Sequence, residues 1–256
     1  DNSVSPGTGG STLTYGYTML KTPAGADFRE INSDYTANEA DRETKSVNLK
    51  IFGGRFEIDR VLANTTNGQI NEVQFQLQEK IRATTNLFHY TAINGDSGTK
   101  GFDGLDTLLV GSSTEMNADV STALDLSTAA AIDQNYKTVL DKLDELLSEL
   151  DGAPTMLIAN AALTTKLRAC ARRAGYLTHS EDAFGRSVTG YNGIPFADMQ
   201  YYYDTAAKKE VPVVPIVTRS ETSGLTDLYA VRLGLDGFHA VSPAGGKVIT
   251  TTLPDF

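Results

Sequence analysis

The clearest pattern of hydrophobic and polar positions along the chain predicts one long amphipathic helix over residues 69–94. Apolar residues recur there at steps of three and four, and charged and amide side chains fill the positions between them. Thr66 and Gln69 form the pattern of a capping box at its start, and Asn94-Gly95 favours a left-handed end. At about 1.5 Å per residue, such a helix would span roughly 38 Å. The stripe expected to face the core consists of Ile70, Val73, Leu77, Ile81 and Phe88.

Two segments before this helix lack a hydrophobic core of their own. Residues 1–25 are rich in Gly, Ser, Thr and Pro, which predicts either a disordered tail or an arm that becomes ordered against another surface. Residues 26–61 predict a long β ribbon with a first leg at 26–35, a polar tip at 36–44 and alternating residues at 47–51. A two-stranded ribbon is marginally stable in water, so we expect it to need a partner surface, on this chain or on another copy. The residues expected in contacts between subunits are Leu13, Tyr15, Tyr17, Leu20, Phe28, Ile31, Tyr35, Lys45 and Lys50.

Beyond residue 105 the pattern mixes helix and strand periods, which predicts an α+β fold. An apolar stripe over 132–150 predicts a second helix. This helix is expected to end at the Asp and Gly residues that precede a proline. Residues 155–159 predict a short buried strand, and Asn160 is expected to cap a third helix that ends at Gly175. Several strands follow, of which 227–233 alternates most clearly and 247–253 is expected to be the last.

Composition and charge exclude several classes of protein. The 256 residues are 40% hydrophobic and 21% charged, which is ordinary for a folded soluble protein with one large or two modest domains. Cys170 is the only cysteine, so no internal disulfide can form. A formal net charge of −10 argues against a general nucleic-acid binder, and no apolar run is long enough to cross a membrane. We expect Asp1 to be a processed or trimmed terminus.

No set of residues completes a catalytic or metal-binding motif. The sequence GDSG at 95–98 is similar to the serine loop of chymotrypsin-like proteases, but the only earlier histidine, His89, lies on the predicted helix. A hydrolase elbow would need glycine where Thr99 stands, and a phosphate loop would need a longer spacing. The histidines, which show no metal-ligand spacing, are His89, His179 and His239. We therefore predict no catalytic residue, no metal and no cofactor.

Two neighbouring helical segments differ in the sign of their charge. Residues 131–151 carry six acids and two bases, whereas residues 161–174 carry four bases and no acid. This contrast has two interpretations. The segments are two separately solvated helix faces, with the arginines also favourable near a helix C-terminus, or they pair electrostatically between neighbouring copies of the chain.

The exit of the long helix resembles a known family. INGD at 93–96, a Gly/Ser spacer and FDGL at 102–105 follow an amphipathic helix in an order that resembles the major capsid proteins of tailed bacteriophages, which have the Hong Kong 97-like fold. APTMLIANAALTTKLRA at 153–169 and a later G-I-P-F element are similar to parts of the same family in pattern. The resemblance covers nearly the whole chain and is strongest over 47–105 and 131–200.

The resemblance implies an α+β Hong Kong 97-like capsid fold with an N-terminal arm, an extended β-hairpin loop, a long spine helix, a peripheral domain and an axial domain. These parts are expected at 1–25 (arm), 26–61 (extended loop), 62–130 (peripheral domain with the spine helix at 69–94), 131–224 (axial domain) and 225–256 (C-terminal strands that close the sheets). In that family the arm and the extended loop lie against neighbouring subunits.

The resemblance also implies a structural, non-enzymatic subunit that forms pentamers and hexamers of an icosahedral head around double-stranded DNA. It implies assembly in the host cytoplasm, a place in the virion, and no membrane. Portal, scaffold, maturation protease and decoration proteins are the other implied partners, and the DNA contact is non-specific. Some capsids of this fold join subunits through a lysine–asparagine bond. Lys45 and Lys50 are candidate lysines, but no motif identifies the other residues. An encapsulin-type shell protein and a small hydrolase stay open as alternatives.

Overall fold

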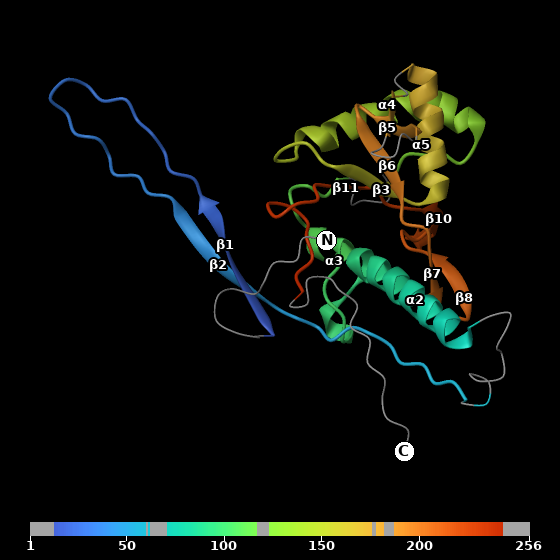
Figure 1. Ribbon diagram of the computed structural model, residues 1–256. Coiled ribbons are helices and arrows are strands. Elements are labelled where there is room, and N and C mark those ends of the chain that lie inside the picture. Colours follow the sequence, from blue (N-terminus) through green and yellow to red (C-terminus); the bar gives the residue numbers. More distant parts are fainter. Residues whose placement is uncertain are drawn as a thin grey trace. The chain divides into compact units, whose positions relative to one another are not determined.

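The computed structural model describes residues 13–59, 61, 71–116, 123–175, 178–181 and 187–242 (Figure 1). The chain divides into two compact units, one of residues 1–51 with 238–256 and one of residues 52–237, and each is described by itself. The described residues mix helices with strands, as the periodicities predict. The predicted strand at 247–253 lies outside the described residues.

The first unit contains a two-stranded antiparallel ribbon. Strand β1 (Thr14–Thr22) pairs with β2 (Asp41–Asn48), and the register runs from Thr14 opposite Asn48 to Leu20 opposite Arg42. The connection at 23–40 contains a turn but no strand. The predicted ribbon boundaries are therefore wrong: its first strand lies in the predicted arm, and the predicted first leg belongs to the connection. The Tyr and Thr residues of β1 have high strand propensity, which the Gly-rich residues before them obscured.

The long helix α2 (Glu72–Asn94) belongs to the second unit. It begins after Asn71, whose side chain accepts a hydrogen bond of 3.1 Å from the Gln74 backbone N–H. The predicted capping residues Thr66 and Gln69 lie outside the described part of the chain. At the other end, Gly95 has φ −65° and ψ 151°, so the predicted left-handed end is not formed. The helix instead leaves in an extended conformation.

Gly95 is required by close packing of the backbone. A Cβ atom there would lie 2.2 Å from the carbonyl oxygen of Phe102 and 2.4 Å from that of Thr91. The chain turns back through the short helix η1 (Ser97–Thr99), and the Gly104 N–H donates to the Gly95 carbonyl at 2.9 Å. Helix α3 (Leu105–Leu109) then begins directly beside the end of α2.

We expect Gly95→Ala to destabilise the second unit by about 1–3 kcal/mol, because the new methyl group overlaps two backbone oxygens that cannot easily move. Urea unfolding followed by circular dichroism measures the change. The matched control is Gly101→Ala in the same turn, where a Cβ atom would meet its nearest neighbour at 3.5 Å. Equal losses from the two variants would show that the close approach at Gly95 is not the cause.

A five-stranded sheet of order β11-β3-β6-β5-β4 forms the other half of this unit. Strand β3 is parallel to β6, and the other neighbouring pairs are antiparallel. The strands are β3 (Met156–Ala159), β4 (Thr178–Glu181), β5 (Ser187–Tyr191), β6 (Ile194–Asp198) and β11 (Tyr229–Val231). Two separate hairpins are β7 (Tyr201–Asp204) with β8 (Lys209–Pro212), and β9 (Val217–Arg219) with β10 (Thr222–Leu225).

Helices α4 (Ala129–Ser148) and α5 (Ala161–Ala174) pack against each other, and α5 also contacts β5 and β6. Their caps explain their ends: Thr128 accepts from the Ala131 N–H at 3.1 Å, Asn160 accepts from the Leu163 N–H at 2.8 Å, and Gly175 is left-handed with φ 75°. The predicted cap at Asn160 and the predicted end at Gly175 are confirmed.

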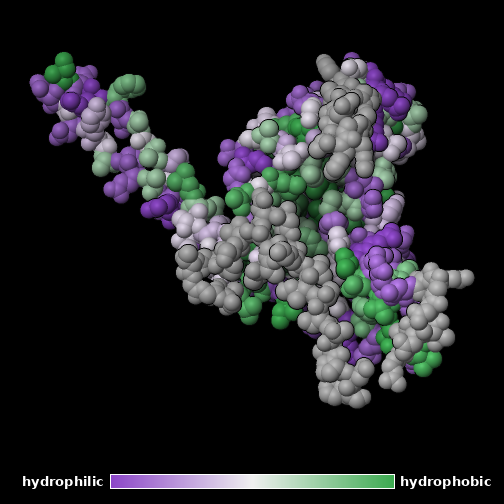
Figure 2. Space-filling view, in the orientation of Figure 1, coloured by the Kyte–Doolittle hydropathy of each residue, from purple (hydrophilic) through white to green (hydrophobic). Residues whose placement is uncertain are grey.

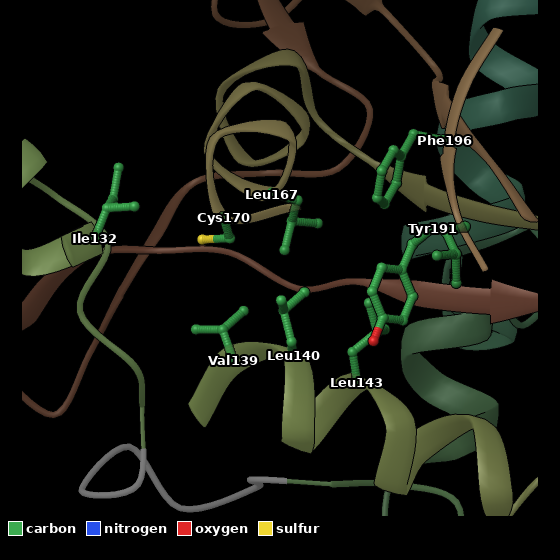
Figure 3. Close-up of a cluster of buried hydrophobic side chains, with 9 residues drawn as sticks. Ile132, Val139, Leu140, Leu143, Leu167, Cys170, Tyr191 and Phe196 are labelled. Carbon is green, nitrogen blue, oxygen red and sulfur yellow. The ribbon is translucent and has the colours of Figure 1, made fainter. Parts of the chain in front are cut away.

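A cluster of buried side chains lies between these two helices and the sheet. Figure 3 shows side chains of α4 and α5 pointing toward one another and toward aromatic rings of the sheet. The members of the cluster are Ile132, Val139, Leu140, Leu143, Leu157, Leu167, Cys170, Tyr191 and Phe196. This core is complete within one chain, so the unit needs no partner to bury it.

Candidate functional site

The ribbon, meaning β1, β2 and their connection at 23–40, has no buried residue among its described positions. Several of its apolar side chains are fully in solvent, including Phe28 and Ile31 in the connection. Ile31 is 91% exposed. Figure 2 shows hydrophobic and hydrophilic residues interspersed along the ribbon. The predicted contact residues Leu13, Tyr17, Leu20, Phe28, Ile31, Tyr35, Lys45 and Lys50 are exposed, and Tyr15 is half-buried. The ribbon therefore presents most of them to solvent.

The register gives the ribbon one more apolar face, which we call the apolar face and which carries Tyr15, Tyr17, Met19 and Val47 together with Lys45 and Glu43. Tyr15 lies opposite Val47, and Tyr17 lies two residues along the same strand, with its ring stacked 6.2 Å from that of Tyr15. The same face continues to Met19, because alternate residues of a strand point to the same side. The other face carries mostly small polar side chains, with Leu20 and Arg42 at its far end, and the Thr14 hydroxyl donates to the Asn48 side-chain oxygen at 3.0 Å.

The connection at 23–40 is organised around one guanidinium group. The Arg29 guanidinium lies 5.2 Å from the centre of the Tyr35 ring and donates to the Ser33 carbonyl oxygen at 3.1 Å. The Ser33 hydroxyl in turn donates to the Glu30 carbonyl oxygen at 2.9 Å. These contacts give the connection a local structure and leave its apolar residues directed outward.

Exposure along α2 differs from the predicted stripe. Val73 is 46% exposed and Ile81 is 36% exposed, so the single chain does not bury them. Leu77 and Phe88 are half-buried, and Ile70 lies outside the described residues. The Phe88 ring lies 6.0 Å from that of Phe52 and 5.7 Å from that of Phe102. Helix α2 packs against β7 and α3, and its buried residues are Ala92 and Ile93 at its C-terminal end.

Two asparagine side chains bind the same buried dipeptide, Val213-Val214. The sequence did not predict this shared contact. The Asn94 side-chain amide donates to the Val213 carbonyl oxygen at 2.7 Å, and the Asn160 amide donates to the Val214 carbonyl oxygen at 3.2 Å. Asn160 also donates to the Thr226 hydroxyl at 2.7 Å. The end of α2 and the start of α5 are thereby joined to the same backbone segment. The only feature of the sequence that could have indicated this contact is the asparagine at each of these two helix ends.

The residues considered for chemistry have structural surroundings. The Asp96 carboxylate accepts the Gly98 N–H and the Asp103 carboxylate accepts the Ser97 N–H, each at 2.8 Å, so both hold the turn after α2. Burial raises the pKa of the Cys170 thiol, which disfavours the reactive thiolate. Burial lowers the pKa of His89. Within the described ranges, no three His, Cys, Asp or Glu side chains gather as a metal site would require. None of the helices in those ranges is long and apolar enough to cross a bilayer.

Comparisons with known proteins point to one family. A family model described as phage capsid protein matches residues 42–246. A search of curated proteins finds no significant match. One similar solved structure is the capsid of a native GTA particle, 12% identical with a TM-score of 0.48, in which 73% of this chain aligns with 62% of that chain. This chain thus spans under two thirds of that protein. Another is from Mycobacterium phage Bobi, 12% identical with a TM-score of 0.43, covering 86% of this chain and 76% of that one.

Proposed function

The chain belongs to the phage capsid protein family, and from this we propose that it forms the pentamers and hexamers of an icosahedral head that encloses double-stranded DNA. Membership makes it a structural, non-enzymatic component of the virion shell, which self-assembles. The observation that supports the finer proposal is the ribbon, whose described residues include no buried side chain. A surface of this kind is stable only when a partner covers it.

The proposal assigns the parts of a Hong Kong 97-like subunit to the chain. Helix α2 is the spine of a peripheral domain at 62–130, and the layer of α4 and α5 with its sheet is the axial domain at 131–224. Residues 225–256 close the sheets, which the pairing of β11 with β3 supports. The extended loop comprises β1, β2 and their connection, and the N-terminal arm is reduced to the residues before β1.

The ribbon is proposed to lie on a neighbouring copy through its apolar face. The proposed contacts are the exposed residues of the ribbon given above, together with Val73 and Ile81 of α2, which the single chain leaves in solvent. The DNA would be held by enclosure and non-specific contacts, because a chain of net charge −10 offers no general phosphate-binding surface. Assembly in the host cytoplasm, with portal, scaffold, maturation protease and decoration proteins, completes the proposal.

The expected result for the purified chain is therefore large particles and not single subunits. At micromolar concentration, light scattering and electron microscopy should find closed shells or free pentamers and hexamers, because the ribbon is stable only when covered. The salt concentration should be varied, since exposed charge contacts weaken as salt rises. A stable species of 27.5 kDa under all of these conditions would overturn the proposal.

A further inference from the structure

One ion pair and one hydrogen bond from a lysine join α5 to α4 and to the residue before its N-cap. The Arg173 guanidinium donates to the Asp133 carboxylate, and the Lys166 ammonium donates to the Ser127 carbonyl oxygen at 2.8 Å. These contacts lie along the seam between the two helices within one chain. Some charged side chains of each helix are therefore used in contacts at the seam, and the other charged side chains lie on other sides of the helices.

The remaining acidic charge forms a stripe on α4 and its end. Asp141, Glu145 and Glu149 recur at intervals of four residues, which places them on one side of the helix. The 3.6-residue period turns this side away from the buried residues, and it turns Glu145 and Glu149 away from Asp133, which marks the seam. All three side chains are exposed, and only Glu145 has an ion pair, with Lys142 at 2.6 Å.

The remaining basic charge lies on the far side of α5. Arg168 and Arg172 are also four residues apart, both are exposed, and the same period places them away from Arg173 and therefore away from the seam. Among the residues that the structure describes, neither guanidinium has a carboxylate partner. The two-helix layer thus has an acidic edge on α4 and a basic edge on α5, each on a side that its own helix turns away from the seam.

We propose that these two edges form a head-to-tail contact between copies of this chain, in which the acidic edge of α4 meets the basic edge of α5 in the next copy. An interface between two different patches of identical subunits is heterologous and produces a ring when its rotation closes. The second copy is the fitting partner because the chain itself carries both complementary edges. The Asp133–Arg173 pair already shows the same combination of groups within the chain. This inference rests on the proposed self-assembly and adds the surface that orients the subunits.

The contact contributes mainly to orientation and rate of assembly. Exposed ion pairs are individually weak, but complementary charge steers encounters, and charges of like sign brought together prevent the wrong arrangement. A ring repeats the contact at every subunit. Closing the ring makes the last contacts intramolecular, so small contributions to the free energy of assembly accumulate through effective concentration. The interface is therefore sensitive to charge reversal and to salt.

The test exchanges the charges of the two edges in the full-length chain. Arg168→Glu with Arg172→Glu makes both edges acidic, and we expect the concentration needed for assembly to rise by about tenfold or more. Adding Asp141→Arg and Glu149→Arg to that variant reverses the two acids of the α4 edge that have no ion pair, restores complementarity and should recover assembly. Light scattering measures the concentration threshold, and circular dichroism confirms that each variant is folded. If the reversed chain does not fold, Arg168→Gln with Arg172→Gln should raise the threshold less and weaken its dependence on salt.

The matched control is Lys208→Glu in the turn between β7 and β8 with Lys209→Glu at the start of β8, which changes the net charge equally on a different surface. It should assemble like the unaltered chain. The proposal is overturned if reversing the arginines has no more effect than this control, or if exchanging both edges fails to improve on reversing one. Failure of the unaltered chain to assemble would instead contradict the proposed function, so the two failures are distinguishable.

Discussion

Chains that lack residues 1–50 should fail to form shells while their larger unit stays folded. The core between α4, α5 and the five-stranded sheet is complete without those residues. The ribbon, in contrast, adds apolar side chains of which none is buried among the residues that the structure describes. A large apolar side chain contributes about 1.5–3 kcal/mol when fully buried. Each subunit both gives and receives such contacts in a shell, so their loss is multiplied across the particle.

Electron microscopy and light scattering would measure this loss, and circular dichroism would measure folding. A milder pair of variants tests the apolar face itself. Tyr17→Ser with Val47→Ser removes apolar surface from that face, whereas Thr18→Ser with Thr44→Ser alters the opposite face by one methyl group at each position. We expect the first pair to weaken assembly strongly and the second pair to change it little. Shells of normal stability from the truncated chain would refute the proposed role of the ribbon.

Asn160→Ala should cost about 2–4 kcal/mol of unfolding free energy, the largest effect expected from a single polar side chain here. The side chain is 4% exposed and performs two tasks. It accepts the Leu163 N–H at the start of α5 and donates to the Val214 carbonyl oxygen and the Thr226 hydroxyl. Its removal uncaps a helix and leaves a buried carbonyl oxygen without its donor.

Urea unfolding of three variants separates the two tasks. Asn160→Asp keeps an acceptor for the helix cap but cannot donate, and it places a carboxylate beside the Val214 carbonyl oxygen. We therefore expect it to be at least as harmful as alanine. Thr128→Ala removes the exposed cap of α4 and should cost about 1 kcal/mol, because only the cap is lost. If Asn160→Ala cost no more than Thr128→Ala, the bonds to Val214 and Thr226 would contribute nothing.

The parts of the fold that are determined by residues close together in the sequence were predictable. The apolar period of α4, the cap at Asn160 and the left-handed Gly175 act within a few residues, so the local sequence contains the whole signal. The family was likewise predictable from the segments around α2, and the matched family model agrees with that prediction. The absence of a complete catalytic motif could also be established from residue types and spacing alone.

The sequence by itself thus determined the helices α4 and α5 and which segments carry apolar or charged side chains, but it placed the first strand of the ribbon wrongly. Only the tertiary structure decided what each segment meets. Strand β1 pairs with β2 across the whole connection at 23–40, and a period of two does not specify which strand the partner is. The pattern of α2 marked Val73 and Ile81 as one stripe but could not show that the single chain leaves them exposed. The shared segment Val213-Val214 joins α2 to α5 through bonds that span 119 and 54 residues. Such contacts arise from packing in three dimensions, which periodicity along the chain does not encode.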